Sequence, residues 1–486
     1  MKEKSFYYKV NKSNGFKKVA REFIACCCIL LMVTMIFAKY CKLTNFSKDA
    51  FYEFNNFIDK DLIDVLCVGS SHMYCHINPV QMFDDFGIVA FDLGAGSQAV
   101  PFSYYYLEEA FKTQTPSLVI LDTYMMISSD DAEKENAQGN FINMNLSYTK
   151  YKALQSVDGL EDRMDILLNF PIMHNRYGSI NNLSFDLEEG SSSTYLGYRY
   201  GTEMQPYDMK DVVDISSVTE VSAVSERKET YLRKCIELCK ENNVDIVLVN
   251  SPFPEINEEY QQVYNLVQQI ANEYEIDFFN GCLYLEQMEL DYSTDYMGGR
   301  HLNYLGAEKY TRWLVGRLLE EGYEFQDRRG DERYKYWEDE SKRLNYAMMR
   351  DLQYNQMEFT DLMNILQADD NLYYILSYNG TAETLLPEYR DYLQSQGIMA
   401  DSSGIFVFKR GKLIWQSCFD DGDSYADYVQ RNWIMVEAGQ EDCLMVKMCN
   451  NNVGVVDRTA EPSVNVYVYN EFTRSYYIGR EYPQVY

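Results

Sequence analysis

The sequence lacks a regular cysteine pattern, although it contains twelve cysteines. Three of them are contiguous at residues 26–28, the others are scattered, and no CxxC pair occurs. Disulfide-rich folds and structural zinc modules both depend on defined cysteine spacing. The cysteines therefore support neither of these two classes.

Basic residues are scarce relative to acidic ones. The chain has 44 lysines and arginines against 74 aspartates and glutamates, which gives a formal net charge of −30. A chain with this charge repels a polyanion such as nucleic acid. We therefore expect no nucleic-acid partner.

The composition is otherwise that of a folded protein. Hydrophobic residues make up 46% of the 486 residues, and the 43 tyrosines and 25 phenylalanines supply large apolar areas. This length accommodates two or three domains with cores of their own.

The N-terminus has the charge pattern of a membrane anchor. Basic residues are concentrated in residues 1–22, and residues 23–38 carry no charge. The run is shorter than the ~20 residues that a bilayer core requires, but the flanking Arg21 and Lys39 extend it. No small-x-small cleavage site follows, and a buried core helix is the alternative. We expect a single-pass anchor in the cell membrane, with a cytoplasmic N-terminus and an extracellular bulk.

Five short apolar segments alternate with helix-like segments between residues 62 and 325. They span residues 63–68, 88–93, 118–124, 244–250 and 276–280. Continuous apolar runs of this length are typical of strands that are buried on both faces. Strands that alternate with helices predict an α/β fold with a doubly wound, flavodoxin-like parallel sheet.

The remaining segments complete a predicted division of the chain. Residues 128–222 break the alternation, and we interpret them as an insertion that is a candidate lid over the substrate. The predicted parts are a basic tail (1–22), an anchor (23–38), a stalk (39–61), the α/β domain (62–325), a helical connector (326–370) and a small α+β domain (371–486).

Two polar motifs lie where an α/β fold places functional side chains. Residues 65–71 (VLCVGSS) form a predicted strand that ends in a glycine-led turn, and His301 lies in the motif RHLN. A serine hydroxyl becomes nucleophilic when an imidazole accepts its proton, and such sites lie at the carboxyl edge of the sheet. Gly94 and Gly96, after the second strand, are candidate amide donors to an oxyanion. The pattern predicts Ser71 and His301 as nucleophile and base, with an ordinary turn and a structural histidine as the alternative.

The order of these motifs resembles the SGNH (GDSL-like) hydrolase superfamily, in the membrane-anchored branch that is similar to the D-alanyl-lipoteichoic-acid and alginate acetylation proteins. Residues 65–71 match the nucleophile block, residues 91–98 (FDLGAGSQ) look like the oxyanion block, and residues 301–307 (HLNYLGA) look like the histidine block. The resemblance covers about residues 64–319, without the insertion. It implies that the amides of Ser71 and of Gly94 or Gly96 hold the oxyanion.

The sequence departs from the family pattern at the triad acid. The family places an aspartate three residues before the histidine, and this chain has Gly298 there. Asp295 is the expected substitute that orients His301, with Asp291 as the alternative; otherwise a Ser–His dyad remains or the site is impaired. The family's third block contains an asparagine that has no clear counterpart here. Asn250, at the end of a predicted strand, is the nearest candidate for that role. Loss of the acid need not abolish activity, because the acid orients the histidine and does not itself take the proton.

No metal or cofactor is expected. His72 and His76 lie four residues apart with Cys75 between them, but no third ligand follows at metalloprotease spacing. The acidic residues between 420 and 427 lack the spacing of an EF-hand loop.

The resemblance implies an extracytoplasmic, membrane-anchored enzyme that transfers an acyl group through Ser71. The expected reaction is O-acetylation of a cell-surface or exopolysaccharide, and the implied partner is a multi-pass membrane O-acyltransferase. A carbohydrate esterase is one alternative. A non-catalytic polysaccharide assembly or binding protein with a degenerate SGNH fold is the other, and Gly298 and the long insertion favour it.

Overall fold

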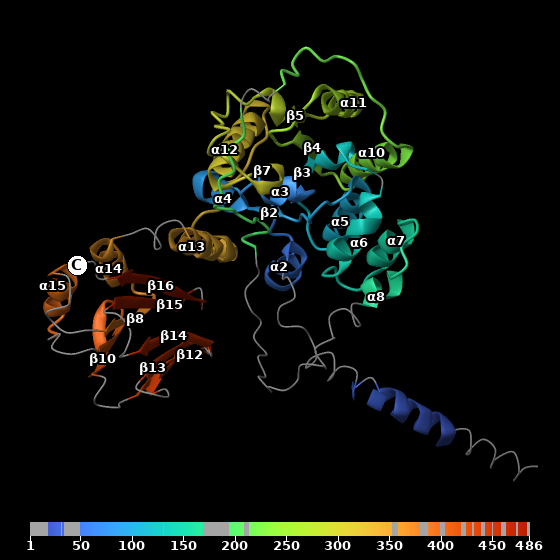
Figure 1. Cartoon of the computed structure of the whole chain (residues 1–486). Helices are drawn as coiled ribbons and strands as arrows, with labels where there is room; N and C mark the ends of the chain where they lie inside the picture. The colour runs from blue at the N-terminus through green and yellow to red at the C-terminus, as the bar shows by residue number, and fades with distance from the viewer. Residues whose placement is uncertain are drawn as a thin grey trace, which may run out of the picture. The chain divides into compact units, whose positions relative to one another are not determined.

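A five-stranded parallel sheet organises the first part of the chain in the computed structural model (Figure 1). Its strands run in the order β2-β1-β3-β4-β5. They are β1 (Val65–Val68), β2 (Ala90–Asp92), β3 (Leu118–Asp122), β4 (Asp245–Asn250) and β5 (Phe278–Asn280). Each of the five apolar segments contains one of these strands, and this strand order is the flavodoxin-like one. The predicted doubly wound parallel sheet is confirmed.

Helices cover both faces of this sheet. Helices α5 (Val100–Ala110) and α10 (Glu226–Glu241) pack together on one face, over β1 and β4. Helices α4 (Pro79–Phe86) and α12 (Tyr304–Glu320) lie together on the other side, with α4 against β2 (Figure 1). Helix α11 (Glu258–Tyr274) connects β4 to β5 and contacts β5.

Asparagine side chains determine where three of these helices begin. Asn78 accepts hydrogen bonds from the first turn of α4, Asn257 from that of α11 and Asn303 from that of α12. An N-cap of this kind satisfies backbone N–H groups that have no partner inside the helix. Since Asn303 lies two residues after His301, its cap also positions the histidine motif.

Shorter elements join the strands and helices of this first unit. They are α2 (Ala50–Phe57), α3 (Ser71–Tyr74), η1 (Tyr124–Ile127), η4 (Gly281–Leu283), β6 (Tyr296–Met297), η5 (Gly298–Arg300), β7 (His301–Leu302) and η6 (Glu332–Tyr334). Strands β6 and β7 form an antiparallel hairpin, in which Met297 pairs with His301. The hairpin places the histidine motif next to the carboxyl end of the sheet.

The predicted insertion contains helices in its first half. These are α6 (Ala132–Phe141), α7 (Tyr148–Ser156) and α8 (Arg163–Leu168). Further along, the amide of Asp92 donates to the carbonyl of Leu196 at 2.9 Å, so this part of the insertion returns to the end of β2. The lid role that we expected stays a prediction, because residues 169–193 and 209–212 lie outside the described residues.

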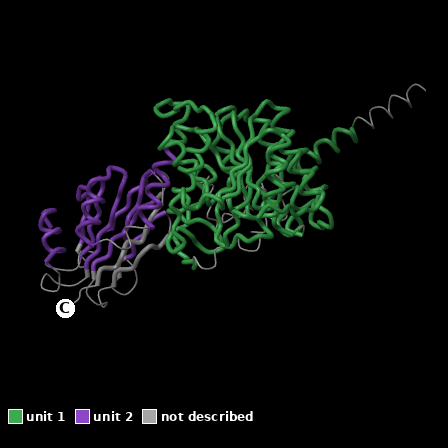
Figure 2. Tube along the Cα trace, turned by 90° about the horizontal axis from the view of Figure 1, so that it is seen from above, with its two compact units in different colours: residues 1–338 green, residues 339–486 purple. Residues whose placement is uncertain are grey.

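The chain divides into two units, residues 1–338 and 339–486 (Figure 2). The division falls inside the predicted helical connector. The structure describes residues 18–30, 32–33, 49–129, 131–168, 194–208, 213–351, 358–379, 387–398, 404–418, 424–429, 432–438, 443–449, 451–457, 463–472 and 475–483.

The described residues of the second unit form two antiparallel sheets and the helices α14 and α15, together with most of α13 (Lys335–Met349), which crosses the division between the units. One sheet has the order β10-β9-β8-β15-β16 and the other the order β11-β12-β13-β14. Alternate residues of β8 face opposite sides: Tyr374 packs with α14 and α15, and Tyr373 packs with the second sheet. The elements are α14 (Phe359–Ala368), β8 (Leu372–Asn379), α15 (Pro387–Ser395), β9 (Gly404–Lys409), β10 (Lys412–Cys418), β11 (Tyr425–Val429), β12 (Asn432–Ala438), β13 (Cys443–Met448), β14 (Asn451–Asp457), β15 (Ser463–Asn470) and β16 (Ser475–Pro483).

The N-terminal segment is helical over residues 18–30. Its large apolar side chains, among them Phe23, Ile24 and Leu30, are exposed. Within the described residues, no helix combines the length and the apolar character needed to cross a membrane. The predicted anchor at residues 23–38 lies partly outside the described residues and stays a prediction.

Two glycines of α12 provide a test of how this helix packs. A Cβ at Gly306 would lie 2.4 Å from the carbonyl oxygen of Asp295, whereas a Cβ at Gly316 would meet nothing within 4 Å. We expect Gly306→Ala to destabilise the protein by about 1–3 kcal/mol through overpacking. Gly316→Ala should stabilise it by about 0.5–1 kcal/mol, because alanine loses less backbone entropy in a helix. Urea denaturation followed by circular dichroism measures both; equal midpoints for the two variants would contradict the close approach at Gly306.

Candidate active site

Ser71 is the first residue of α3, directly after the carboxyl end of β1. The preceding residue, Ser70, caps this short helix, because its hydroxyl accepts a hydrogen bond from the amide of His72 at 3.2 Å. We call residues 69–71 the nucleophile turn. The turn presents the Ser71 hydroxyl at the edge of the sheet where α/β folds place their sites.

Asp122, the last residue of β3, holds the nucleophile turn. Its Oδ2 accepts hydrogen bonds from the Ser70 amide at 3.0 Å and from the Ser70 hydroxyl at 2.6 Å. Gly69 permits this approach, since a Cβ there would lie 2.3 Å from the Cβ of Asp122. Burial raises the pKa of Asp122, and the hydrogen bonds from Ser70 and Tyr124 oppose that rise. The carboxylate therefore acts as a buried anchor for the turn.

His301 meets Ser71 in space although 230 positions separate them. Its Nε2 lies 2.8 Å from the Oγ of Ser71. This separation is within the range that a general base needs in order to take a proton from a hydroxyl. The structure thus brings together the two residues that the sequence singles out as nucleophile and base.

A backbone carbonyl takes the position that a triad acid would occupy. The Nδ1 of His301 lies 3.1 Å from the carbonyl oxygen of Gly298. A carbonyl can only accept, so Nδ1 carries the proton and the lone pair of Nε2 faces Ser71. Gly299 has φ 78°, and a Cβ there would lie 2.9 Å from Nδ1. Glycine at position 299 is therefore what lets the turn close onto the imidazole.

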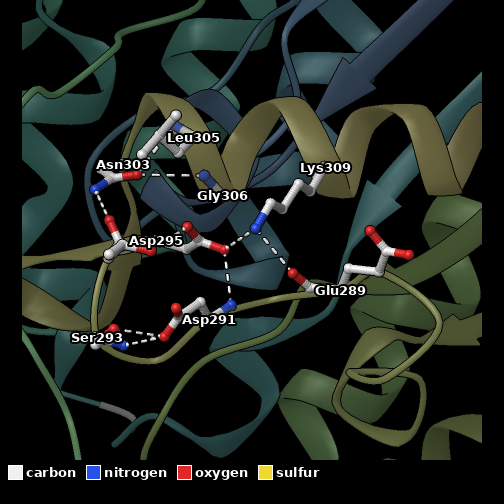
Figure 3. Close-up of polar contacts among 9 residues, drawn as sticks. Glu289, Asp291, Ser293, Asp295, Asn303, Leu305, Gly306 and Lys309 are labelled. Carbon is white, nitrogen blue, oxygen red and sulfur yellow. Dashed lines mark hydrogen bonds and ion pairs between the residues drawn. The ribbon is translucent and has the colours of Figure 1, made fainter.

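Asp295 is hydrogen-bonded to groups other than His301, contrary to the expectation from the sequence. Figure 3 shows the contacts of its carboxylate with Asp291 and Lys309. Its Oδ2 accepts from the Asp291 amide at 2.8 Å and from Lys309 Nζ at 2.7 Å, and its Oδ1 accepts from the Thr294 hydroxyl at 2.9 Å. The reason lies in the β6–β7 pairing, which places Asp295 beyond Tyr296, at the end of the hairpin opposite to the turn.

Asp291, the alternative acid, is also engaged elsewhere. Its Oδ1 accepts from the amide and the hydroxyl of Ser293, at 2.8 and 2.6 Å (Figure 3). Among the described residues, no carboxylate is hydrogen-bonded to His301. The geometry is that of a Ser–His dyad completed by a carbonyl.

The expected oxyanion donors lie beside the nucleophile turn. The amide of Ala95 donates to the Gly69 carbonyl at 3.1 Å, and a Cβ at Gly94 would lie 3.0 Å from that same oxygen. In the part of the chain that the structure describes, the amides of Ser71, Gly94 and Gly96 donate no backbone hydrogen bond. Their role as donors to a developing oxyanion stays a prediction.

Asn140 of the insertion braces the same loop. Its Nδ2 donates to the carbonyl of Gly96 at 3.1 Å. Asn250 was the candidate for the asparagine of the family's third block. Its Nδ2 instead donates to Oδ1 of Asn280 at 2.9 Å inside the sheet. We call the loop after β2, residues 93–97, the oxyanion loop. The structure places Asn140 of the insertion beside this loop, whereas Asn250 is bonded inside the sheet.

Three of the four histidines of the chain gather at this site. The ring of His72 lies 4.6 Å from that of His76 and 5.0 Å from that of His301, and it stacks on Tyr124 at 3.5 Å. Burial, and after it the neighbouring imidazoles, lowers the pKa of His76 well below its usual value; burial, His301 and Arg300 do the same for His72. Both rings are therefore neutral near pH 7.

His76 also holds the histidine motif in place through a hydrogen bond to its backbone. Its Nε2 accepts a hydrogen bond from the amide of Leu302 at 3.0 Å. His72 and His76 thus act in the packing of the site. Among the described residues, no group of three or more His, Cys, Asp or Glu side chains is arranged to hold a metal ion.

Several of these contacts escape sequence reasoning. The carbonyl of Gly298 is a backbone group and has no signature in the sequence. Asp122 does have a sequence signature, because a carboxylate at the carboxyl end of an apolar strand indicates a specific contact at that edge of the sheet. Asn140 lies in a segment with no motif, so only the fold shows its position.

The comparisons with known proteins give distant likenesses to solved structures. No family model matches the chain, and no curated protein matches it. One solved structure, a candidate acylhydrolase from Bacteroides fragilis NCTC 9343, has a TM-score of 0.28 and 12% identity over 58% of this chain and 98% of its own. A GDSL-like lipase from Bacteroides thetaiotaomicron VPI-5482 has a TM-score of 0.28 and 11% identity over 56% and 98%. Likenesses at this level carry no argument about the activity of the present chain.

The protonation state of the site can be measured directly. Burial lowers the pKa of His301, and the hydrogen bond to Gly298 partly opposes that effect. We expect NMR titration of labelled imidazoles to give His301 a pKa below the ordinary value of about 6.5, with Nδ1 protonated in the neutral form. Single histidine substitutions assign the signals. A pKa above the ordinary value, or a proton on Nε2, would contradict the described orientation.

Proposed function

We propose that this protein is an acyl-transfer enzyme of SGNH type, with Ser71 as nucleophile and His301 as base. The observation that carries the proposal is the 2.8 Å contact between Ser71 Oγ and a His301 Nε2 whose lone pair is free to accept. A hydroxyl is a weak nucleophile until a base takes its proton. Here that base is neutral near pH 7, because burial lowers its pKa.

The reaction follows from this geometry in two steps. The Ser71 oxygen attacks an ester carbonyl while His301 takes the hydroxyl proton, and the amides of Ser71 and of Gly94 or Gly96 hold the negative oxygen. The tetrahedral intermediate then collapses, the alcohol leaves with the proton of His301, and an acyl group stays on Ser71. A second hydroxyl reverses these steps and carries the acyl group away.

The carbonyl of Gly298 supports His301 during both steps. It keeps the proton on Nδ1, and its dipole stabilises the imidazolium that forms when Nε2 accepts the second proton. A neutral carbonyl stabilises this cation less than a carboxylate does. We therefore expect the site to be active at a lower rate than a complete triad.

O-acetylation of a cell-surface polysaccharide is the reaction that we assign to this chemistry. The resemblance to membrane-anchored acetylation proteins supports it, and so do the exposed apolar side chains of the N-terminal helix, which suit a membrane anchor. In this proposal a multi-pass membrane O-acyltransferase supplies the acyl group. If water reaches the acyl-enzyme in place of a sugar hydroxyl, the same site acts as a carbohydrate esterase.

A non-catalytic polysaccharide-binding protein is the second candidate. One observation favours it: both carboxylates near the histidine motif, Asp291 and Asp295, are bonded to other groups. A degenerate site would keep the fold and lose the chemistry. The activity of Ser71 therefore separates the two candidates.

Replacement of Ser71 tests the proposal. Ser71→Ala should reduce kcat/KM for a small acetyl ester by about 10³-fold or more, since the nucleophile is lost. A fluorophosphonate probe should label the wild type at Ser71, and His301→Ala should remove the labelling. Ser117→Ala serves as the control, because this residue precedes β3 at the opposite edge of the sheet. A folded wild type that neither turns over the ester nor reacts with the probe would favour the second candidate.

A further inference from the structure

The first unit has a cleft that is lined in part by Arg300, the residue before His301, and that the acyl-transfer chemistry does not itself use. It has a volume of about 450 Å³, within the range typical of ligand sites. Its polar lining comes from two separate segments and from the histidine motif: Tyr207, Asp208, Glu255, Asn257, Tyr260 and Arg300. All of these residues belong to the first unit.

Arg300 connects the cleft to the reacting groups. It directly precedes His301 in the chain, and its side chain lines the cleft. Its guanidinium lies near the Tyr124 side chain, and the Tyr124 ring stacks on His72, whose ring lies 5.0 Å from that of His301. A molecule in the cleft therefore lies next to the acyl-transfer site.

The backbone of Arg300 has a strained conformation, which indicates that the position of its side chain in the cleft is specifically maintained. Its φ is 67°, a left-handed conformation that costs free energy for a residue with a side chain. An ion pair between the guanidinium and the carboxylate of Glu255 offsets this cost, and the side chains of Tyr124 and Tyr260 lie near the same guanidinium. Strain of this kind is concentrated at sites where a side chain must be presented in one orientation.

The charges of the cleft select against anionic ligands. Among the described lining residues, Asp208 and Glu255 are acidic and Arg300 is basic, so the described part of the lining carries one net negative charge. Arg300 already forms an ion pair with Glu255. A carboxylate or phosphate on a ligand would have to displace Glu255 from that pair and then lie near Asp208. Like-charge contacts of this kind are a strong source of discrimination between ligands.

The remaining lining suits a sugar. Tyr207 and Tyr260 present aromatic rings with a polar tip, which can cover the apolar face of a pyranose and bond its hydroxyls. Carboxylates such as those of Asp208 and Glu255 accept hydrogen bonds from hydroxyl groups. Together these groups favour a ligand that carries hydroxyl groups and no negative charge.

From these observations we infer that the cleft binds the acceptor, and that the acceptor is a glycan without anionic groups. Its role as acceptor rests on the acyl-transfer function proposed above. Arg300, Glu255 and Tyr260 are the residues that determine the specificity.

Binding to the full chain carrying Ser71→Ala tests this inference without turnover. The probes are oligomers of equal length: neutral glucose, mannose, galactose and N-acetylglucosamine oligomers, and an oligogalacturonate. Isothermal titration should show at least one neutral oligomer bound about tenfold or more tighter than the uronate. Equal or tighter binding of the uronate, or no binding of any neutral oligomer, overturns the inference.

Two pairs of variants assign the binding to the cleft. Tyr260→Ala should weaken the binding of the neutral oligomer about tenfold, because the aromatic ring is lost. The control Tyr151→Ala, at an exposed tyrosine on α7, should leave the binding unchanged. Glu255→Lys reverses the charge of the lining and should reduce the preference over uronate about tenfold. Glu241→Lys changes the net charge of the chain equally at the end of α10 and should leave the preference intact. Equal effects of a variant and its control would place the binding elsewhere and overturn the inference.

The ester assay separates this inference from the proposed function. If the wild type hydrolyses the small ester but the uronate is the better ligand, the function stands and the inference fails. If no ester is turned over and neutral oligomers still bind in the cleft, the assignment of a glycan site stands, and the enzymatic role, with the acceptor role that rests on it, fails.

Discussion

The hydrogen bond between Nδ1 of His301 and the carbonyl of Gly298 is the contact on which the account of this site depends. It fixes which ring nitrogen carries the proton, and it thereby leaves Nε2 free to accept from Ser71 at 2.8 Å. The turn that makes it possible contains Gly299 at φ 78°, where any side chain would meet the imidazole. The dyad is therefore oriented by the backbone, and the same turn ends in Arg300, which lines the proposed acceptor cleft.

The sheet provides the rigid frame for this arrangement. Parallel strands place the nucleophile turn after β1, the oxyanion loop after β2 and the anchor Asp122 at the end of β3, side by side at one edge. His76 then ties the histidine motif to α3 through Leu302. Burial keeps His72 and His76 neutral, so that neither of these rings adds a positive charge that would oppose the formation of the His301 imidazolium. Stability and chemistry rest on the same buried contacts.

Much of this arrangement could be predicted from the sequence, and the failures have physical reasons. Apolar runs of strand length predicted all five strands, because a strand buried on both faces can hold few polar residues. The pairing of Ser71 with His301 followed from motifs at predicted strand ends. Asp295 was the wrong partner for His301, since the register of β6 and β7 turns its carboxylate toward Lys309. The Gly298 carbonyl is a backbone group in a turn three residues before His301, and the side chain of Asn140 acts through a tertiary contact; a side-chain pattern reveals neither.

The most direct test of the central claim is the kcat/KM of Asp295→Asn for a small acetyl ester, measured as a function of pH. If the Gly298 carbonyl orients His301, the variant should retain activity within about tenfold of the wild type, with the same acid limb, at temperatures where circular dichroism shows it folded. A loss of about 10⁴-fold, as expected for removal of a triad acid, would contradict the account.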